Sequence, residues 1–576
     1  MKVWILRESI RRGVTGWEPP DIDGKENEMR ITNRIMQRNN LSNINTNKIY
    51  QNKLSNQMSS QKKINRPSDD PVIAIRALRL RSNVTEITQY YSKNIPDAES
   101  WLKVTEDAIS NLSQIITNMI ARCNKGVNSY LKTEDRSIIL KELKALGESV
   151  YATGDADYAG RYVFTGFRTD TSLSFLEAKE QKYTITEQLD SSAIDTVTKV
   201  DTDKLLDINA NNFADAGMAV EEDDITSVEA YRIRLAYNNC VDAGDPADAT
   251  LMPSIKFIDK DGNPQTWGPT DFELMHPYDK PTTGAPPTTT TYSSPYDYVA
   301  ANKDALVYVP ETGELLLGAD RYDQLMGTKD RESTPNINEA EIQVTYTKSN
   351  WEKGDLRPEH YFYCKAEVKD AEGNIDTVEY NDSYIDPKLS AEHQIIEYDV
   401  GYNQTIRINS TADECFKHGI GREVYDIVNA MQDVLDLEGA QTDIDNIIKG
   451  LEADPASDPD GSKMEILQKQ QAAVKKALEL AKQKEQSLFA GGITELQKYL
   501  SDANLCVTDC GSRSSKLELI KNRSQNQKTT YETLKSENED IDITEVAIEL
   551  SAAELTYDAA LMASGKVMQN TLLNFI

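Results

Sequence analysis

The chain has 576 residues, of which 94 are Asp or Glu and 63 are Lys or Arg, so its net charge at neutral pH is −31. This length predicts about three or four domains and a sizeable core. A strong negative charge disfavours binding to a nucleic-acid backbone, because the phosphates would repel it. The sequence has no run of about 18 apolar residues, so no membrane insertion is predicted.

The first 28 residues differ in sequence pattern from the rest of the chain. They have neither the apolar core nor the small-residue cleavage site of a signal peptide. We therefore expect residues 1–28 to be an extension, with either Met1 or Met29 as the true start. If the protein leaves the cell, it is expected to do so without a cleaved signal.

An apolar stripe at 3,4 spacing runs from Ile73 to Met119 and predicts a long, coiled-coil-like helix. Pro96 should interrupt this helix and kink it locally. A second helix is predicted to start with Thr133 as its cap and to carry an apolar stripe that ends at Val150.

The stretch "NRPSDDP" at residues 65–71 lies before the long helix and after another helical stretch. Pro67 should end the first helix, because a proline pushes the residue before it out of the helical region. Asp70 can cap the next helix, Pro71 suits its first turn, and Asp69 adds negative charge near the positive helix end. The sequence thus predicts a rigid turn between two helices at residues 65–71, which is called the joint below.

From about residue 170 to 420 the pattern changes to short β signals. The segments 254–267 and 305–318 are predicted hairpins. Further strands are predicted within 341–347, 361–380 and 404–410. The Thr- and Pro-rich stretch 281–295 is predicted to be a flexible or extended linker.

The chain becomes helical again from residue 424 to about 500, with a polar, acidic break at "EADPASDPDGSK". Another helical stripe contains Leu517, Ile520, Tyr531 and Leu534, and a last one runs from Val546 to the end of the chain. The predicted fold is therefore mainly α with an inserted β-rich middle domain.

Charge supports pairing of the two ends of the chain. Residues 29–66 hold eight basic residues and no acid, whereas residues 537–576 hold eight acids and one lysine. Opposite charges and apolar stripes predict long antiparallel helices, or a coiled coil, formed by the N- and C-terminal segments. The alternative is that each charge set is only a solvated helix face.

No pattern of residues indicates catalysis, a cofactor or a metal. His276, His360, His393 and His418 lack the HExxH spacing and are interpreted as surface or packing residues. The six cysteines fit neither a redox motif nor a zinc site, so free thiols are favoured, with a Cys506–Cys510 disulfide as the alternative. The protein is predicted not to be an enzyme.

Four motifs, in this order, resemble those of the flagellar hook–filament junction family, the third hook-associated proteins within the flagellin family. They are "INRPSDDPVIAIRALRLRS" at 64–82, "GRYVFTGFRTDTSLSF" at 160–175, "IIEYDVGYNQTIRINS" at 395–410, and the carboxyl-terminal "IDITEVAIELSAAELTYDAALMASGKVMQNTLLNFI". Residues 176–394 and 436–499 match nothing in that family that we can use.

The resemblance implies a structural protein outside the cell, at the junction between flagellar hook and filament, that seats the first filament subunits. It implies type III export with a cytoplasmic chaperone, and assembly as a ring of copies of itself. The other implied partners are the first hook-associated protein and flagellin or the filament cap. No cofactor is implied.

The sequence pattern and the resemblance together predict the domains and the assembly motifs. The expected domains are an extension at 1–28, a terminal coiled-coil domain of 29–66 with 540–576, a helical domain of 67–170 with 424–539 that includes the extra segment 436–499, and a variable β-rich middle at 171–423. The motif residues are Asn65, Pro67, Ser68, Asp69, Asp70, Pro71, Gly160, Arg161, Phe164, Gly166, Leu550, Tyr557, Leu561, Met568, Leu572, Leu573 and Phe575.

Three rival interpretations stay open from the sequence. The first is flagellin itself, although flagellins usually have a joint more like "INSAKDDA". The second is an enzyme grafted into the middle domain, and the missing HExxH motif disfavours a metallopeptidase graft. The third is a secreted coiled-coil adhesin whose middle domain binds carbohydrate.

Overall fold

The structure is a computed structural model. It describes residues 33–128, 131–202, 204–242, 251–259, 263–283, 290–326, 342–369, 375–384, 394–454, 458 and 461–569. The predicted extension 1–28, Met29, His393, Leu572, Leu573 and Phe575 lie outside these residues, as does the side chain of Met568.

The chain divides into two compact units. The first comprises the described residues up to Glu86 and from Gln527 onward, and the second comprises Ile87–Asn526. Two helices, α2 (Pro71–Gln89) and α9 (Ser462–Glu539), have residues in both units. The domain boundaries predicted at 66/67 and 539/540 stay predictions.

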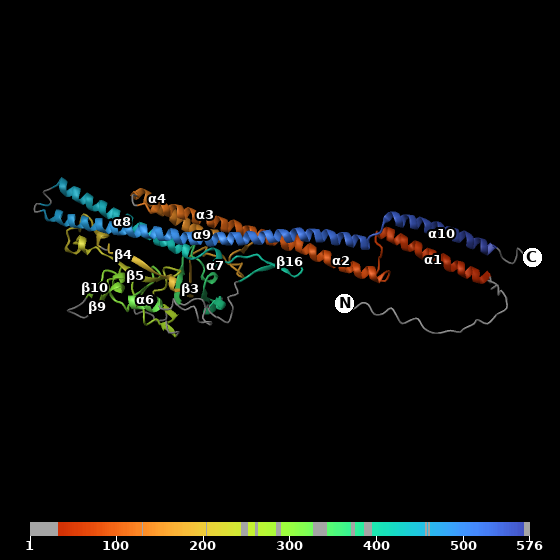
Figure 1. Cartoon of the computed structure of the whole chain (residues 1–576), viewed down its shortest axis with the longest axis horizontal. Coiled ribbons are helices and arrows are strands. Elements are labelled where there is room, and N and C mark those ends of the chain that lie inside the picture. The colour runs from red at the N-terminus through yellow and green to blue at the C-terminus, as the bar shows by residue number, and fades with distance from the viewer. Residues whose placement is uncertain are drawn as a thin grey trace, which may run out of the picture. The chain divides into compact units, whose positions relative to one another are not determined.

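The first unit is built on α1 (Asn33–Ser60) and α10 (Ile543–Gln569), which lie side by side (Figure 1). They run antiparallel, because Tyr50 hydrogen-bonds to Glu549 whereas Lys62, beyond the end of α1, bonds to Asp540. Leu54 is buried with Val546 and Ala553 between them. The predicted pairing of the chain ends is confirmed.

In the second unit, a π-helical turn at Tyr90–Asn94 links α2 to α3 (Ile95–Gly126), and Pro96 is the second residue of α3. A proline cannot donate to the carbonyl four residues earlier and its ring clashes with it, and a widened turn accommodates that defect. The interruption predicted at Pro96 is therefore present, and it takes the form of a π turn just before the proline.

Helix α3 buries residues at strict 3,4 spacing against α4 (Thr133–Gly154), and α4 in turn packs on α8 (Gly419–Ala453). The buried stripe is Ile95, Ala98, Leu102, Thr105, Ile109, Leu112, Ile116, Met119 and Cys123. The predicted cap at Thr133 is wrong, because Lys132 takes that position. The Thr133 hydroxyl donates instead to Glu438, at 2.7 Å.

Two antiparallel-rich sheets form the β region. The five-stranded sheet has the order β4 (Ile194–Val200), β5 (Ser227–Arg234), β12 (Glu314–Leu317), β11 (Leu306–Val309) and β8 (Glu273–Leu274). The six-stranded sheet has the order β15 (Ile375–Tyr380), β14 (Tyr363–Lys369), β3 (Lys179–Leu189), β13 (Ile342–Trp351), β6 (Ser254–Ile258) and β7 (Pro264–Trp267). Only the β8–β11 pair among these strands is parallel.

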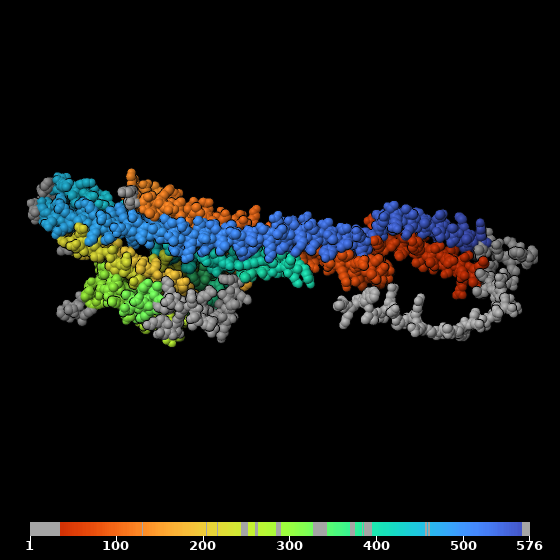
Figure 2. Space-filling model, in the orientation of Figure 1, coloured from red at the N-terminus to blue at the C-terminus, as the bar shows by residue number. Residues whose placement is uncertain are grey.

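Alternate side chains of the strands point into two different hydrophobic clusters. In β11, Leu306 and Tyr308 join the main core, whereas Val307 and Val309 face a smaller cluster that includes Val299 of α5 (Pro295–Ala301). Successive side chains of a strand point to opposite faces, so this sheet is covered on both faces. The β region lies on one side of α9 (Figures 1 and 2).

Three two-stranded sheets, two short α-helices and six 3-10 helices of three residues each complete the described elements. The sheets are β1 (Asp157–Tyr158) with β2 (Arg161–Tyr162), β9 (Thr282–Thr283) with β10 (Thr290–Thr291), and β16 (Glu397–Gly401) with β17 (Gln404–Arg407). The short helices are α6 (Ala319–Met326) and α7 (Ala412–Cys415).

The two predicted hairpins are confirmed, with Ile255 opposite Trp267 in β6–β7 and Leu306 opposite Leu317 in β11–β12. The stretch 281–295, predicted as a linker, contributes β9, β10 and the start of α5 where it is described.

The extra segment 436–499 belongs to a hairpin of two long helices. The acidic break falls between the end of α8 at Ala453 and the start of α9 at Ser462, as predicted, and α9 then continues unbroken for 78 residues. Side chains from 200–225, among them Leu205 and Phe213, pack against both helices and form a separate core with them. Among the described residues, no helix is long and apolar enough to cross a membrane.

Candidate functional site

The joint at residues 65–71 begins earlier than predicted. Helix α1 ends at Ser60, not at Arg66, because Gln61 has a left-handed φ of 57° and the backbone then pairs with the chain before α10. The N–H of Lys63 donates to the Glu539 carbonyl at 2.7 Å, and the N–H of Ile541 donates to the Gln61 carbonyl at 3.3 Å. Pro67 therefore lies inside the turn and does not end the helix.

Two aspartates shape the rest of the joint. The Asp70 carboxylate accepts from the N–H groups of Val72 and Ile73, at 2.9 and 3.1 Å, so it caps α2 as predicted, and Pro71 is the first helical residue. Asp69 has a different role from the one predicted. Its carboxylate accepts from the backbone N–H groups of Asn65 and Arg66, at 3.1 and 2.9 Å, and closes the turn.

An ion-pair cluster that the sequence did not reveal holds this joint. Glu539, whose side chain is 3% exposed, accepts two hydrogen bonds from the Arg81 guanidinium, at 2.6 and 2.7 Å, and lies 3.6 Å from the Lys62 ammonium. The hydrogen bonds from Arg81 lower the pKa of Glu539. Arg81 and Glu539 are far apart in sequence, and Arg81 lies outside the basic segment 29–66 whose charge predicted that the chain ends pair.

The second motif forms the tight hairpin β1–β2. Gly160 has a φ of +77°, a conformation that suits glycine, and its N–H donates to Asp157 at 3.1 Å. Arg161 stacks over the Trp101 ring of α3, with its guanidinium carbon 4.9 Å from the ring centre, and lies 3.5 Å from Asp97.

Asp97 is the centre of this cluster, which the sequence did not reveal either. Its carboxylate accepts from the hydroxyls of Tyr158 and Tyr398, at 2.9 and 2.7 Å. Burial raises the pKa of Asp97, but these hydrogen bonds and the charge of Arg161 outweigh it and lower that pKa. The cluster ties β2 and β16 to α3.

The remaining residues of this motif are packing residues. Phe164 is buried and meets Phe416 edge to face, with ring centres 4.8 Å apart. Gly166 has a φ of +61°, and a side chain there would collide with Gln394, whose amide oxygen accepts from the Phe167 N–H at 2.9 Å. The motif therefore fixes the interior of the second unit.

The third group of predicted residues lies on α10. Leu550 and Tyr557 are half-buried, whereas Leu561 is 45% exposed. The structure thus brings the joint and the α10 stripe together in the first unit and places Gly160, Arg161, Phe164 and Gly166 in the second.

Comparison with known families now adds to this geometry. Residues 31–169 match the family described as the bacterial flagellin N-terminal helical region. This match contains both the joint and the β1–β2 motif. Below, residues 31–169 are called the flagellin-family region, after the family that their sequence matches.

The chain is also similar to the flagellar hook-associated protein 3 of Salmonella typhimurium and to that of Escherichia coli. They are 27% identical over 145 residues and 28% identical over 170 residues, respectively. These matches cover 25% and 28% of this chain and 45% and 53% of the two relatives. The chain therefore spans about half the length of the curated relatives it matches.

Solved structures of a putative flagellar hook-associated protein from Vibrio parahaemolyticus and of a flagellar junction protein from Legionella pneumophila are also similar. They are 13% and 10% identical, with TM-scores of 0.27 and 0.22. The alignments cover 82% and 81% of this chain and 100% of each solved chain. Because these TM-scores are low, the similarity to flagellar proteins rests on the sequence matches and not on these solved structures.

Outside the flagellin-family region, a buried charge cluster joins the β region to α8. Arg232 of β5, 5% exposed, lies 2.7 Å from Asp426 and also pairs with Glu314. Arg234 lies 2.6 Å from the same Asp426 and pairs with Glu423. Burial raises the pKa of Asp426, but the charges of Arg232, Arg234 and Arg422 outweigh it and lower that pKa. These ion pairs connect β5 to α8.

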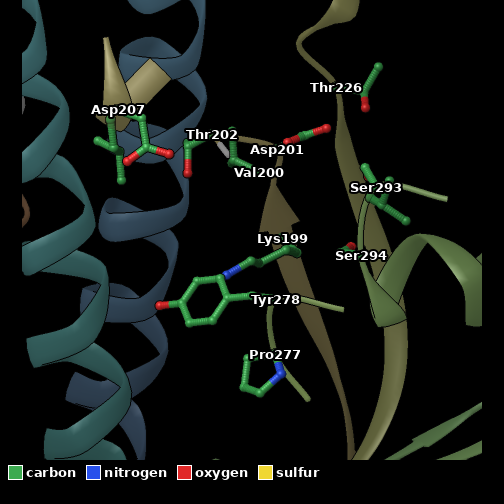
Figure 3. Close-up of a pocket in the computed structure, with 12 residues that line it drawn as sticks. Lys199, Val200, Asp201, Thr202, Asp207, Thr226, Pro277, Tyr278, Ser293 and Ser294 are labelled. Atoms are coloured by element: carbon green, nitrogen blue, oxygen red, sulfur yellow. The ribbon is translucent and has the colours of Figure 1, made fainter. Parts of the chain in front are cut away.

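A pocket of about 360 Å³ also lies outside the flagellin-family region (Figure 3). It is lined by Lys199, Val200, Asp201, Thr202, Leu206, Asp207, Thr226, Val228, Pro277, Tyr278, Ser293 and Ser294. The Ser294 hydroxyl accepts from the Asp297 N–H at 3.3 Å and caps α5. None of the predicted site residues lines this pocket, and its serines serve the start of a helix.

The described histidines act in packing and in one surface pair. His360 is buried, and burial lowers its pKa to about 4; its Nε2 lies 3.0 Å from the Ser172 carbonyl oxygen. His418 meets the Phe362 ring edge to face, with ring centres 5.1 Å apart. His276, half exposed, pairs with Glu311, and this hydrogen bond raises its pKa.

Proposed function

We propose that this protein is a structural component of the bacterial flagellum that joins the hook to the filament and seats the first filament subunits. The flagellin-family region at 31–169 supports this, as do two relatives that are both named flagellar hook-associated protein 3. In this proposal the protein is not an enzyme and binds neither nucleic acid nor a cofactor.

The observation that carries the proposal is the uncovered apolar surface of the α1–α10 pair. Leu41 and Ile49 of α1 are 64% and 62% exposed, and Ile548, Leu555 and Met562 of α10 are 67%, 73% and 71% exposed. Water disfavours so many exposed large apolar side chains, so a partner is expected to cover them. Neighbouring copies in a ring would do so.

The proposed partners are copies of this chain, the first hook-associated protein, flagellin or the filament cap, and a cytoplasmic export chaperone. The proposed location is the hook–filament junction outside the cell, reached without a cleaved signal. The motif residues on α10 would contact neighbouring copies, and the joint at 65–71 would separate the coiled-coil domain (29–66 with 540–576) from the helical domain.

Deletion of the gene tests the junction role. We expect cells with intact hooks, no filaments, and flagellin shed into the medium, and we expect the full chain to restore filaments. Normal filaments after deletion would contradict the proposal. Loss of the main filament polypeptide itself, both from the cells and from the medium, would instead identify the protein as flagellin.

Transfer of residues 29–75 to a passenger protein tests the export proposal. We expect this segment to direct the passenger into the medium only in cells with a working flagellar export apparatus. A segment of equal length from α3 and α4, residues 95–141, is the matched control and should leave the passenger inside. Retention of both passengers would contradict the proposed export segment.

A further inference from the structure

Two thiols from distant parts of the chain meet at the end of α7. Cys415, the last residue of α7, is 1% exposed, and Cys506 of α9 is half-buried. The Cys506 sulfur lies 3.5 Å from the carbonyl oxygen of Glu414, the residue next to Cys415. The two thiols are also close enough to shift each other's pKa. All six cysteines are free in this structure.

Cys510, which the sequence offered as the partner of Cys506, is poorly placed for that bond. It lies one turn later on the same helix, and its buried thiol donates to the Leu102 carbonyl oxygen at 3.3 Å. Residues four apart on a helix have Cβ atoms about 5–6 Å apart, whereas a disulfide requires about 3.5–4.5 Å. A bond between Cys506 and Cys510 would therefore deform α9.

The thiols of the other pair differ in reactivity. The interaction between them lowers the pKa of Cys506 and raises that of Cys415, and burial raises the pKa of Cys415 further. The thiolate is the attacking species in thiol–disulfide exchange. Cys506 is both the more accessible and the more acidic thiol, so a reagent in solution should react with it first.

We propose that Cys415 and Cys506 form a disulfide when the folded chain meets a small disulfide oxidant, and that this bond fastens α7 to α9. The Cys506 thiolate attacks one sulfur of oxidised glutathione and releases one reduced glutathione. The Cys415 thiol then loses its proton and attacks the Cys506 sulfur of the mixed disulfide, which releases the second glutathione. Two protein thiols are oxidised and one glutathione disulfide is reduced.

The bond would act where the chain leaves the β region. Strand β17 ends at Arg407, α7 follows, and the chain then enters α8. A Cys415–Cys506 bond would close a loop that contains all of α8 and the first half of α9. A loop this long restricts the unfolded chain strongly. The proposal does not depend on the flagellar role.

Peptide mapping of the full-length protein tests the bond. The protein is purified reduced, treated under native conditions with oxidised glutathione, alkylated and digested. We expect one linked peptide pair that contains Cys415 and Cys506, and two fewer free thiols than the original six. The bond should also raise Tm by about 3–5 °C, and a reductant should reverse that shift.

Three variants complete the test. Cys415→Ser and Cys506→Ser should each lose the linked peptide and the Tm shift, whereas the matched control Cys510→Ser should keep both. Peptide mapping of the unaltered chain still tests for the Cys415–Cys506 bond where a variant fails to fold. The proposal is overturned if Cys415 and Cys506 both remain open to alkylation, or if Cys506 is linked to Cys510 or to another chain.

Discussion

Helices α1 and α3 have similar lengths, but only one of them is well buried. Helix α3 has 32 residues and buries twelve of them, whereas α1 has 28 residues and buries only Leu54 among its described side chains. Helix α3 is covered by α4 and other elements of its own unit, whereas α1 has α10. A periodic pattern predicts a helix, but the partners within one chain decide how much of that helix is buried.

The composition of α1 fits this difference. Eight of its 28 residues are asparagine, which is a poor helix former, and its apolar stripe is thin. In proteins, most helical stability comes from packing an apolar face. We therefore expect α1 to need contacts from other molecules to be as stable as α3.

The largest expected effect is in amide hydrogen exchange. In the dilute protein, amides of α1 should exchange faster than those of α3 by about a thousandfold or more, since α3 opens only with most of its unit. Exchange measured by mass spectrometry, with limited proteolysis alongside, checks this. Equal protection of the two helices would show that the α1–α10 pair is stable without neighbours.

The next largest effect is expected from removing a buried charge in the second unit. Arg232→Met removes the arginine that pairs with Glu314 and one of the arginines that pair with Asp426. This loss should lower the free energy of unfolding by about 3–5 kcal/mol. The matched control is Lys365→Met, which breaks an exposed pair with Glu379 and should change it by less than about 1 kcal/mol. Urea unfolding measures both, and similar losses would contradict the distinction.

A buried carboxyl group makes the second unit sensitive to pH. Burial raises the pKa of Glu187 to about 7, although the Tyr346 hydroxyl and the Ala236 N–H donate to it. The pKa of Glu187 is higher in the folded than in the unfolded state. The stability that its protonated form contributes is therefore complete below about pH 4 and is lost as the pH rises through 7.

Glu187→Gln should therefore remove this pH dependence and raise the stability at pH 8 by about 3 kcal/mol, because the buried charge is gone. Glu180→Gln, a change at a more exposed position of the same strand, is the control. Unfolding measured at pH 5 and pH 8 would contradict the expectation if the unaltered protein and the Glu187→Gln variant responded equally.

The smallest expected effect is at the joint of the first unit. Glu539→Gln removes the charge that Arg81 binds and should weaken the joint by about 1 kcal/mol, because Arg81 itself is more than half exposed. The pKa of Glu539 is lowered, so this contribution is present above about pH 4 and is lost as the pH falls through the folded value.

Exchange at the amides of 61–75 measures this change, with Glu537→Gln, an exposed neighbour, as the control. Unchanged exchange in the Glu539→Gln variant would mean that the backbone bonds between 61–63 and 539–541 hold the joint by themselves.

The sequence predicted what local patterns can encode. The stripe that ends at Met119, the cap at Asp70 and the hairpin at 305–318 depend on near neighbours in the chain, and each is present. Strands β3, β4 and β5 were not predicted, because their place in the sheets depends on distant partners such as β13 and β12. Thr133 failed as a cap because Glu438, 305 residues away, binds its hydroxyl.

The clusters around Asp97, Glu539 and Arg232 were missed for the same reason. Arg232 and Asp426 are 194 residues apart, and nothing near either residue marks its partner. Opposite charge at the chain ends indicated that the ends pair, but not which residues meet. Local signals thus predicted the elements, while the contacts that fix the candidate site come from the folded chain.

The arginines of β5 and the carboxylates of α8 also limit how this chain can change by recombination. A β region exchanged with that of another protein would take Arg232 and Arg234 away and leave Asp426 and Glu423 behind on the helix. The helix would then hold two partly buried acids that have lost their arginine partners on β5. Inherited exchanges of residues 179–407, from β3 to β17, should therefore carry compensating changes at 423 and 426, even though both positions lie beyond the segment exchanged.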